Sequence, residues 1–227
     1  MKSIKILYSP QEEVILEKES RPMEVDLTSV KNHYAALGEK HEKPFERFMD
    51  FWNGEAYEKF FNPAARVLRM KREKAEEIFG SEFLCGDTEV EEIALAIWTI
   101  GRGLEQESSD LMSSSGDIMT GFLLDVAGSV ALYNMHDVLV DWVRENIAAP
   151  EKNFVVREFY PGFDSVNQNM MGRVVAASRA SETIGVEARC DSLLSPRKTQ
   201  CSFIGIDSTE REKMVTAVPC NPCGGTK

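Results

Sequence analysis

Arg157 is a basic residue whose neighbours fit the binding of an anionic small molecule. The segment Phe154–Tyr160 is predicted to be a strand, and Pro161-Gly162 directly after it predicts a turn. An arginine fork can bind a carboxylate through two parallel hydrogen bonds, and a glycine lets a ligand approach the backbone closely. The alternative is structural, with Arg157 in a surface ion pair and Gly162 in an ordinary turn.

Other residues near this turn could complete a binding site. Tyr160 or Phe163 can supply an apolar face to a ligand. Lys198, which follows Pro196, adds a second cation near the next predicted strand. Each of these residues taken singly has a structural alternative as well.

Cys220 and Cys223 have the spacing of a metal or redox pair. A zinc site needs four ligands, and no second pair has a suitable spacing. No βαβ pattern flanks the pair, which argues against a thioredoxin-like site. The two cysteines are weak candidates for a role shared with another chain or with Cys201, and a mobile tail is the alternative. Five cysteines without a visible secretion signal argue against a disulfide framework.

Motifs of common catalytic and nucleotide-binding sites are missing from the sequence. It has no Gly-x-Ser-x-Gly, no P-loop and no complete dinucleotide fingerprint. Gly101-Arg-Gly103 lies between a predicted strand and a predicted helix, but Gln106 stands where a third glycine belongs. Phosphate binding at the start of that helix is therefore a weak alternative. The histidines are scattered, which predicts no metal site, and His136 is expected to be satisfied by hydrogen bonds.

Composition and charge are those of an ordinary globular protein. The chain has 227 residues, of which 43% are hydrophobic and 28% charged, enough for one large domain or two small ones. A formal net charge of -11 disfavours nonspecific binding to nucleic acid or to an anionic membrane. The apolar run Ile93–Ile100 is too short to span a bilayer, and Asp125 interrupts the apolar stretch 118–135. We expect a cytoplasmic protein without a membrane or nucleic-acid partner.

Hydrophobic periodicity predicts the elements that would position these residues. Val90–Gly101 is continuous enough to be a central strand. Asp117 is a good N-cap for a long helix over Ile118–Asn146. The aromatic stripe of Lys43–Phe61 has helical spacing and is expected to face the core, with a wall against a flat ligand as the alternative. Further helices are predicted over 27–38, 64–79, 104–112 and 166–181, and further strands over 2–8, 185–190 and 199–207.

Isolated strands among longer helices indicate an α+β fold with a twisted, largely antiparallel sheet flanked by helices. We expect three regions. Residues 1–89 would be a helical N-terminal region that packs on the core, residues 90–215 the α+β core, and residues 216–227 a cysteine-containing tail.

Two segments lie about fifty residues apart, one made of Thr99–Glu105 and Leu124–Ala131 and the other of Arg157–Phe163 and Ser192–Lys198. Together they resemble the activation domain of cobalamin-dependent methionine synthase. The similarity covers roughly residues 90 to 207, and it rests on the order and spacing of several short motifs. The residues that carry it are Thr99, Ile100, Gly101, Leu104, Glu105, Leu124, Asp125, Gly128, Ser129, Arg157, Pro161, Gly162, Phe163, Ile184, Gly185, Val186, Ser192, Pro196 and Lys198.

The resemblance implies a helix-flanked, antiparallel α+β domain that binds S-adenosylmethionine in a shallow groove. It implies docking over a cobalamin that a separate corrinoid protein or corrinoid methyltransferase holds. A flavodoxin- or ferredoxin-like donor would supply an electron to cob(II)alamin, and S-adenosylmethionine would supply the methyl group. The work of the protein is then mainly orientation, which needs no catalytic dyad.

The resemblance also implies roles for individual residues. Arg157 would bind the ligand's carboxylate, and Lys198 would contribute a second cation. Tyr160, Pro161 and Gly162 would hold the adenosine or methionine part.

Two positions depart from the family pattern and are expected to face the corrin. Phe163 stands where many relatives have tyrosine, and Tyr133 stands where a carboxylate is expected. These departures leave open the alternative of a non-enzymatic module of the same fold that binds a corrinoid protein or another small ligand.

Overall fold

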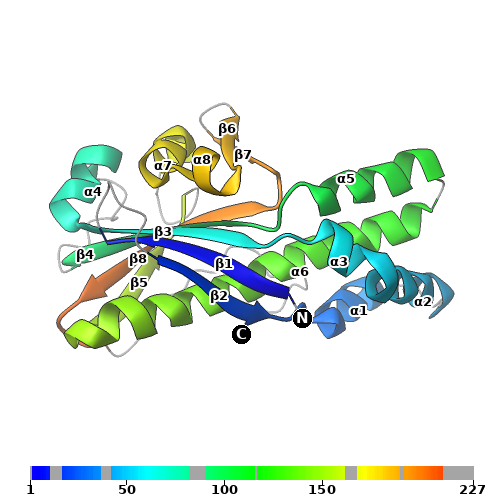
Figure 1. Ribbon diagram of the computed structural model, residues 1–227, viewed down its shortest axis with the longest axis horizontal. Helices are drawn as coiled ribbons and strands as arrows, with labels where there is room; N and C mark the ends of the chain where they lie inside the picture. Colours follow the sequence, from blue (N-terminus) through cyan, green and yellow to red (C-terminus); the bar gives the residue numbers. More distant parts are fainter. Residues whose placement is uncertain are drawn as a thin grey trace.

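The structure is a computed structural model of the chain, and it describes residues 2–10, 17–36, 42–81, 90–115, 117–161, 168–189 and 192–211. Its centre is a six-stranded sheet with helices on both faces (Figure 1). The strand order is β2-β1-β3-β4-β8-β5. The bounds are β1 Lys2–Ser9, β2 Glu17–Met23, β3 Ala64–Lys71, β4 Glu92–Thr99, β5 Phe154–Phe159 and β8 Thr199–Asp207.

Most neighbouring strands in the sheet are antiparallel. β1 and β3 run parallel, while β2 with β1, β3 with β4, β4 with β8 and β8 with β5 run antiparallel. The prediction of a largely antiparallel sheet flanked by helices is therefore confirmed, with one parallel pair that makes the sheet mixed. β4 lies between β3 and β8 with every side chain buried, as its continuous apolar run predicts.

One face of the sheet packs on the long helix α6 (Ile118–Val143), which continues through the π-helical η4 (Arg144–Ala148) and the 3-10 turn η5 (Ala149–Glu151). Beyond the sheet, α6 packs on further helical segments (Figure 1). These are α1 Leu27–Ala36, α2 Glu42–Phe51, α5 Gly103–Asp110 and the π-helical η3 Leu111–Ser115, with η1 Trp52–Ala56 and α3 Tyr57–Phe60 following α2.

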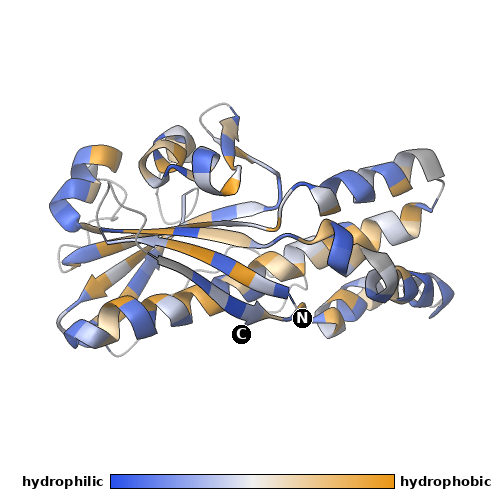
Figure 2. Cartoon of the chain, in the orientation of Figure 1, coloured by the Kyte–Doolittle hydropathy of each residue, from blue (hydrophilic) through white to orange (hydrophobic). Residues whose placement is uncertain are grey.

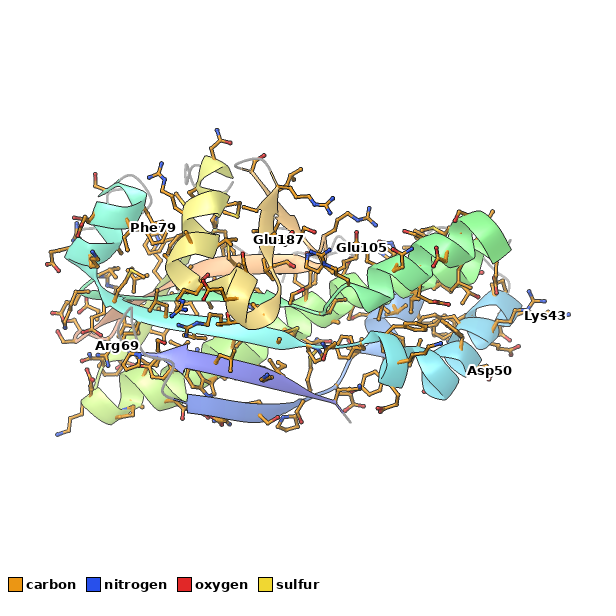
Figure 3. All side chains as sticks on the ribbon, turned by 45° about the horizontal axis from the view of Figure 1, so that its top comes forward. Lys43, Asp50, Arg69, Phe79, Glu105 and Glu187 are labelled. Carbon is orange, nitrogen blue, oxygen red and sulfur yellow. The ribbon has the colours of Figure 1, made fainter. Side chains whose placement is uncertain are left out.

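The opposite face of the sheet carries shorter elements. They are α4 Arg72–Phe79, η6 Gln168–Met170, α7 Met171–Ser178, α8 Ala180–Ile184 and the hairpin of β6 Glu187–Arg189 with β7 Leu193–Ser195. Figure 3 labels Phe79 on α4, whose ring meets Phe203 of β8 edge-on at 4.9 Å between centroids. Each face therefore has its own hydrophobic core, with the sheet between them.

The prediction of the long helix from Asp117 onward is confirmed. The carboxylate of Asp117 accepts a hydrogen bond from the backbone N–H of Thr120, as an N-cap does. By length and composition, Ile118–Glu151 could cross a membrane, but 61% of its most apolar window is buried inside the fold. Figure 2 shows apolar residues along this helix, and many of them are buried in the core between the helix, the sheet and the neighbouring helices. This burial is what the core helix of a soluble α/β protein shows.

The expectation of a helical N-terminal region is wrong, because residues 2–71 contribute β1, β2 and β3 to the main sheet. The predicted helix over 64–79 is a strand over Ala64–Lys71, and only Arg72–Phe79 is helical. The spacing of the basic residues in β3 resembles that of a polar helix face, which is why the sequence predicts a helix here. Arg66, however, is buried, and its guanidinium donates to the carbonyls of Leu7 and Ser178.

The aromatic stripe is confirmed as core. Phe48, Trp52 and Phe61 are buried in the cluster beneath α6. Residues 216–227, with Cys220 and Cys223, lie outside the described residues, as do Gly162 and Phe163.

Candidate functional site

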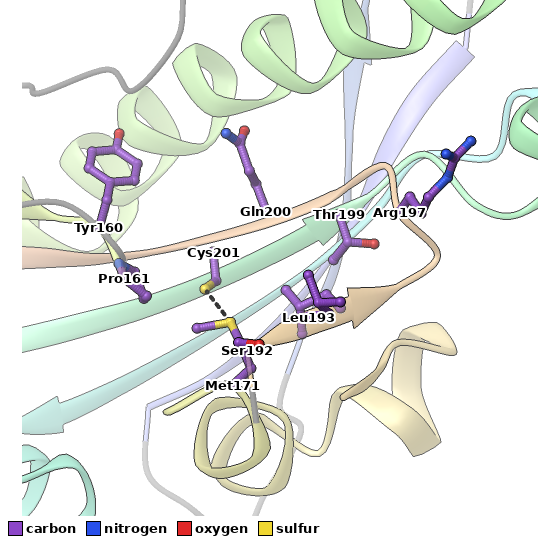
Figure 4. Close-up of a pocket in the computed structure, with 10 residues that line it drawn as sticks. Tyr160, Pro161, Met171, Ser192, Leu193, Arg197, Thr199, Gln200 and Cys201 are labelled. Atoms are coloured by element: carbon purple, nitrogen blue, oxygen red, sulfur yellow. Dashed lines mark hydrogen bonds between the residues drawn. The ribbon is translucent and has the colours of Figure 1, made fainter. Parts of the chain in front are cut away.

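A cavity of about 420 Å³ opens where β5 ends and β8 continues (Figure 4). Its walls come from the end of β5, the start of β8, the β7 hairpin and α7. The lining residues are Tyr160, Pro161, Met171, Ser192, Leu193, Leu194, Arg197, Thr199, Gln200 and Cys201. This volume lies in the range of pockets that hold small molecules and cofactors.

The cavity borders a stretch of β8 that pairs with β4 on one side and, among the described residues, has no paired strand on the β5 side. β5 stops at Phe159, opposite Phe203, whereas β8 begins four residues earlier, at Thr199. The N–H of Ile100 donates to the carbonyl of Lys198. In this part of β8, therefore, the even-numbered residues are the ones whose backbone groups hydrogen-bond to β4. By alternation, the backbone groups of Thr199 and Cys201 point toward the cavity side. They offer donors and acceptors to a ligand lying along the strand.

Two of the predicted contact residues, Tyr160 and Pro161, line the cavity. The Tyr160 ring points toward α6 in Figure 4, and its hydroxyl lies 2.7 Å from Nε2 of His136. Gly162 and Phe163, which follow directly in the sequence, belong to the part of the chain that the structure leaves undescribed.

Arg157 lies on β5, next to an irregularity in the pairing with β8. Its guanidinium carbon is 5.0 Å from the centre of the Phe159 ring, an attractive cation–π geometry. Arg157 is not among the described residues that line the cavity. It precedes Tyr160 by three positions, so the two residues belong to the same end of β5.

Lys198 faces α6 and not the cavity. Its Nζ lies 2.9 Å from the Asp125 carboxylate and 2.8 Å from the Ser129 hydroxyl, and only 13% of the side chain is exposed. The structure therefore assigns Lys198 a structural contact where the residue pattern predicted a ligand contact.

Arg197, the preceding residue, is the basic side chain that lines the cavity. Glu105 orients it: one carboxylate oxygen accepts from Nε at 2.8 Å, and the other from the backbone N–H at 2.9 Å. Its Nη2 is 4.0 Å from Asp125, and 65% of the side chain is exposed. Sequence reasoning missed Arg197, although it stands directly beside Lys198 in the Pro-Arg-Lys motif.

Tyr133 lies on α6, half-buried, and the described lining of the cavity does not include it. It lies about one helical turn before His136. Its predicted position against a corrin is therefore separate from the cavity wall formed by Tyr160.

His136, Glu158 and Tyr160 form a buried polar cluster behind the cavity. Burial by itself lowers the pKa of His136, but hydrogen bonds and charges of Asp137 and Glu158 outweigh it and raise this pKa to about 9. Burial, with the nearby carboxylate of Glu158, raises the pKa of Tyr160. The sequence indicates this cluster only through one glutamate inside an apolar strand and one histidine inside an apolar helix.

The described lining of the cavity offers groups that can bind a ligand, and its cysteine, Cys201, is not activated as a nucleophile. Burial raises the pKa of the Cys201 thiol to about 12, so this thiol stays protonated and unreactive at neutral pH. Its sulfur lies 3.8 Å from the sulfur of Met171. Within the described ranges, no cluster of three or more His, Cys, Asp or Glu side chains could hold a metal ion.

The glycines of Gly101-Arg-Gly103 have steric roles. Gly101 has a φ of +83°, which favours glycine. A Cβ on Gly103 would lie 2.9 Å from the carbonyl oxygen of Phe60, so this glycine lets α5 approach the last residue of α3 closely. The positive φ accounts for Gly101 and close packing accounts for Gly103, without a phosphate.

The two segments that carry the resemblance meet in space. Glu105 binds Arg197, Asp125 and Ser129 bind Lys198, and the Thr99 hydroxyl donates to the carbonyl of Lys198. No protein-family model matches the chain, and no curated protein matches it. What the chain does must therefore be inferred from this junction and from the cavity beside it.

Proposed function

We propose that the chain is a stand-alone activation-domain-like subunit that binds S-adenosylmethionine and docks on a corrinoid protein. There it would serve the reductive methylation of cob(II)alamin, with an electron from a flavodoxin- or ferredoxin-like donor. The observation that carries the proposal is the cavity at the edge of β8. It joins Tyr160 and Pro161 from one segment of the resemblance to Arg197, which Glu105 from the other segment orients.

The lining of the cavity is chemically suited to S-adenosylmethionine. The exposed guanidinium of Arg197 can bind the carboxylate of the methionine part. The backbone groups of Thr199 and Cys201 can pair with the polar edge of a base, as a strand edge pairs with an extended ligand. Pro161 and Leu194 supply apolar contact. Arg157, close in sequence on β5, is the second candidate for the carboxylate.

Bound S-adenosylmethionine would supply the methyl group, and the corrinoid would come with the partner. The residues of this chain then have one task, which is to hold the sulfonium methyl in a fixed orientation toward the docked partner. Leu193 lies at the cavity and is 59% exposed, so the surface beside the ligand carries an apolar residue that a partner could cover. Phe163 and Tyr133 remain the proposed corrin-facing residues.

Titration calorimetry of the pure protein with S-adenosylmethionine tests the proposal. We expect saturable binding that Arg197→Met weakens about tenfold, the loss of one charge-assisted contact. Arg144→Met is the matched control, because Arg144 is exposed, pairs with Asp141 and is not part of the described lining. Arg157→Ala shows which arginine binds the carboxylate. Absence of heat, together with absence of protection against thermal unfolding, would refute ligand binding.

A second candidate is a non-enzymatic module that binds a corrinoid protein, or another small ligand, without methyl transfer. The contact of Lys198 with Asp125 and Ser129 favours it, because this cation is withdrawn from the proposed ligand. A purified corrinoid protein that the chain retains on a column, in the absence of S-adenosylmethionine binding, would select this candidate.

A further inference from the structure

His136 on α6 contacts two residues at the end of β5, Glu158 and Tyr160. Its Nε2 lies 3.0 and 3.1 Å from the two carboxylate oxygens of Glu158. The same nitrogen lies 2.7 Å from the hydroxyl of Tyr160, which lines the cavity. His136 and Tyr160 are buried, and Glu158 is completely inaccessible to solvent.

The charge state of the cluster follows from its partners. Asp137 on α6 faces Nδ1 of His136 at 3.0 Å, and Glu158 and Tyr160 face Nε2. Trp98 of β4 contacts the imidazole with its ring. With two carboxylates at its nitrogens, His136 is an imidazolium at neutral pH, and the Tyr160 phenol keeps its proton.

A buried ion pair adds little net stability compared with apolar side chains of similar size, because both charges lose their hydration. This pair nevertheless lies directly behind a residue of the cavity wall. Its geometry holds the phenol on one side of the sheet edge, immediately before Pro161, which also lines the cavity.

We propose that His136 and Glu158 are positioning residues that clamp Tyr160 as a fixed wall of the cavity at the end of β5. The clamp itself is independent of the ligand, and only its effect on S-adenosylmethionine binding rests on the proposed function. Loss of the clamp would free the Tyr160 side chain and open the cavity toward its buried residues. Cys201, which is 6% exposed and lines the same cavity, would then meet solvent more often.

Alkylation of Cys201 measures this opening without any ligand. The protein is treated with iodoacetamide at pH 7.5, and peptide mapping follows the modification of Cys201 alone. We expect Tyr160→Phe and His136→Gln to speed modification about tenfold, as expected when one hydrogen bond to a charged group is lost. Tyr57→Phe is the control, because the Tyr57 hydroxyl also makes two hydrogen bonds, partly buried and away from the cavity: it accepts from the backbone N–H of Lys2 and donates to the carbonyl of Met23.

Calorimetry with S-adenosylmethionine on the same proteins gives the second readout, with an expected loss of about tenfold in affinity for both variants. If the wild-type protein binds no S-adenosylmethionine, the proposed function fails while the alkylation rates still decide on the clamp. Rates within twofold of wild type in both variants overturn the clamp, whatever the affinities are. Tyr160→Phe keeps the ring, so this variant retains the test if His136→Gln does not fold.

Discussion

The ammonium group of Lys198 lies 2.9 Å from the carboxylate of Asp125, a residue 73 positions earlier in the chain. The Ser129 hydroxyl, one helical turn further along α6, lies 2.8 Å from the same nitrogen. This contact fastens the start of β8 to α6. Lys198, Asp125 and Ser129 belong to the residues that resemble a ligand-binding motif, but in the structure they connect the start of β8 to α6.

Replacing Lys198 with methionine should lower the free energy of unfolding by about 1–2 kcal/mol, because a half-buried carboxylate loses its partner. Urea denaturation measures the change. Lys5→Met is the control, since Lys5 is exposed on β1 and should tolerate the change within about 0.5 kcal/mol. A Lys198→Met protein with unchanged stability and no ligand binding would show instead that Lys198 belongs to the binding site.

Glu105→Gln should weaken S-adenosylmethionine binding about threefold through its effect on Arg197, since an amide orients the guanidinium less firmly than a carboxylate. In a double variant with Arg197→Met, the Glu105 substitution should add nothing, because the group that it orients is gone. Calorimetry on the four proteins gives the coupling energy. Additive effects would contradict the orienting role of Glu105.

The contribution of His136 to the free energy of unfolding should decrease as the pH rises. The folded-state pKa of about 9 lies above the ordinary value of 6.5, so the contribution of this group is fully present below pH 6.5 and is lost as the pH rises through 9. The contribution amounts to at most about 3 kcal/mol at low pH.

The difference in unfolding free energy between wild type and His136→Gln should therefore narrow between pH 6 and about pH 9.5. Denaturation at several pH values checks this change. The imidazole resonances of His136 report its pKa directly, and a value near 6.5 would contradict the buried ion pair with Glu158.

Gly103→Ala should destabilise the fold by about 1–3 kcal/mol, the usual cost of overpacking. The added methyl group would meet the backbone of Phe60, which cannot move aside as a flexible side chain can. Thermal unfolding of this variant is compared with Gly54→Ala. A Cβ at Gly54 meets nothing within 4 Å, so that change should be neutral or should stabilise by up to about 1 kcal/mol.

Much of the fold could be predicted wherever a local pattern was sufficient. The strand over Thr199–Asp207, the central strand around Glu92–Thr99 and the helix that starts after Asp117 all have the predicted positions. β3 could not be predicted, because its buried Arg66 is satisfied by carbonyls of distant residues. A polar residue in a strand interior becomes interpretable only when its partners are known.

Only part of the candidate site could be predicted from the sequence. The turn pattern predicts ligand contacts at Tyr160 and Pro161, and both residues line the cavity. His136 and Glu158 were not selected, since a lone histidine in a helix and a lone glutamate in a strand carry no spacing signal. Only packing of α6 on β5 brings their side chains to 3.0 Å.

The amino-acid sequence by itself determined the apolar strands, the capped helix and the cations and aromatics near two turns, because these depend on neighbouring residues. The tertiary structure alone decided which cation a ligand can reach. Arg197 and Lys198 are adjacent, both basic and both close to Asp125, yet 65% of the Arg197 side chain is exposed and only 13% of the Lys198 side chain is. Once the fold has formed, Asp125 and Ser129 of α6 hold the ammonium of Lys198, whereas Arg197 is bound by Glu105 and stays exposed at the cavity.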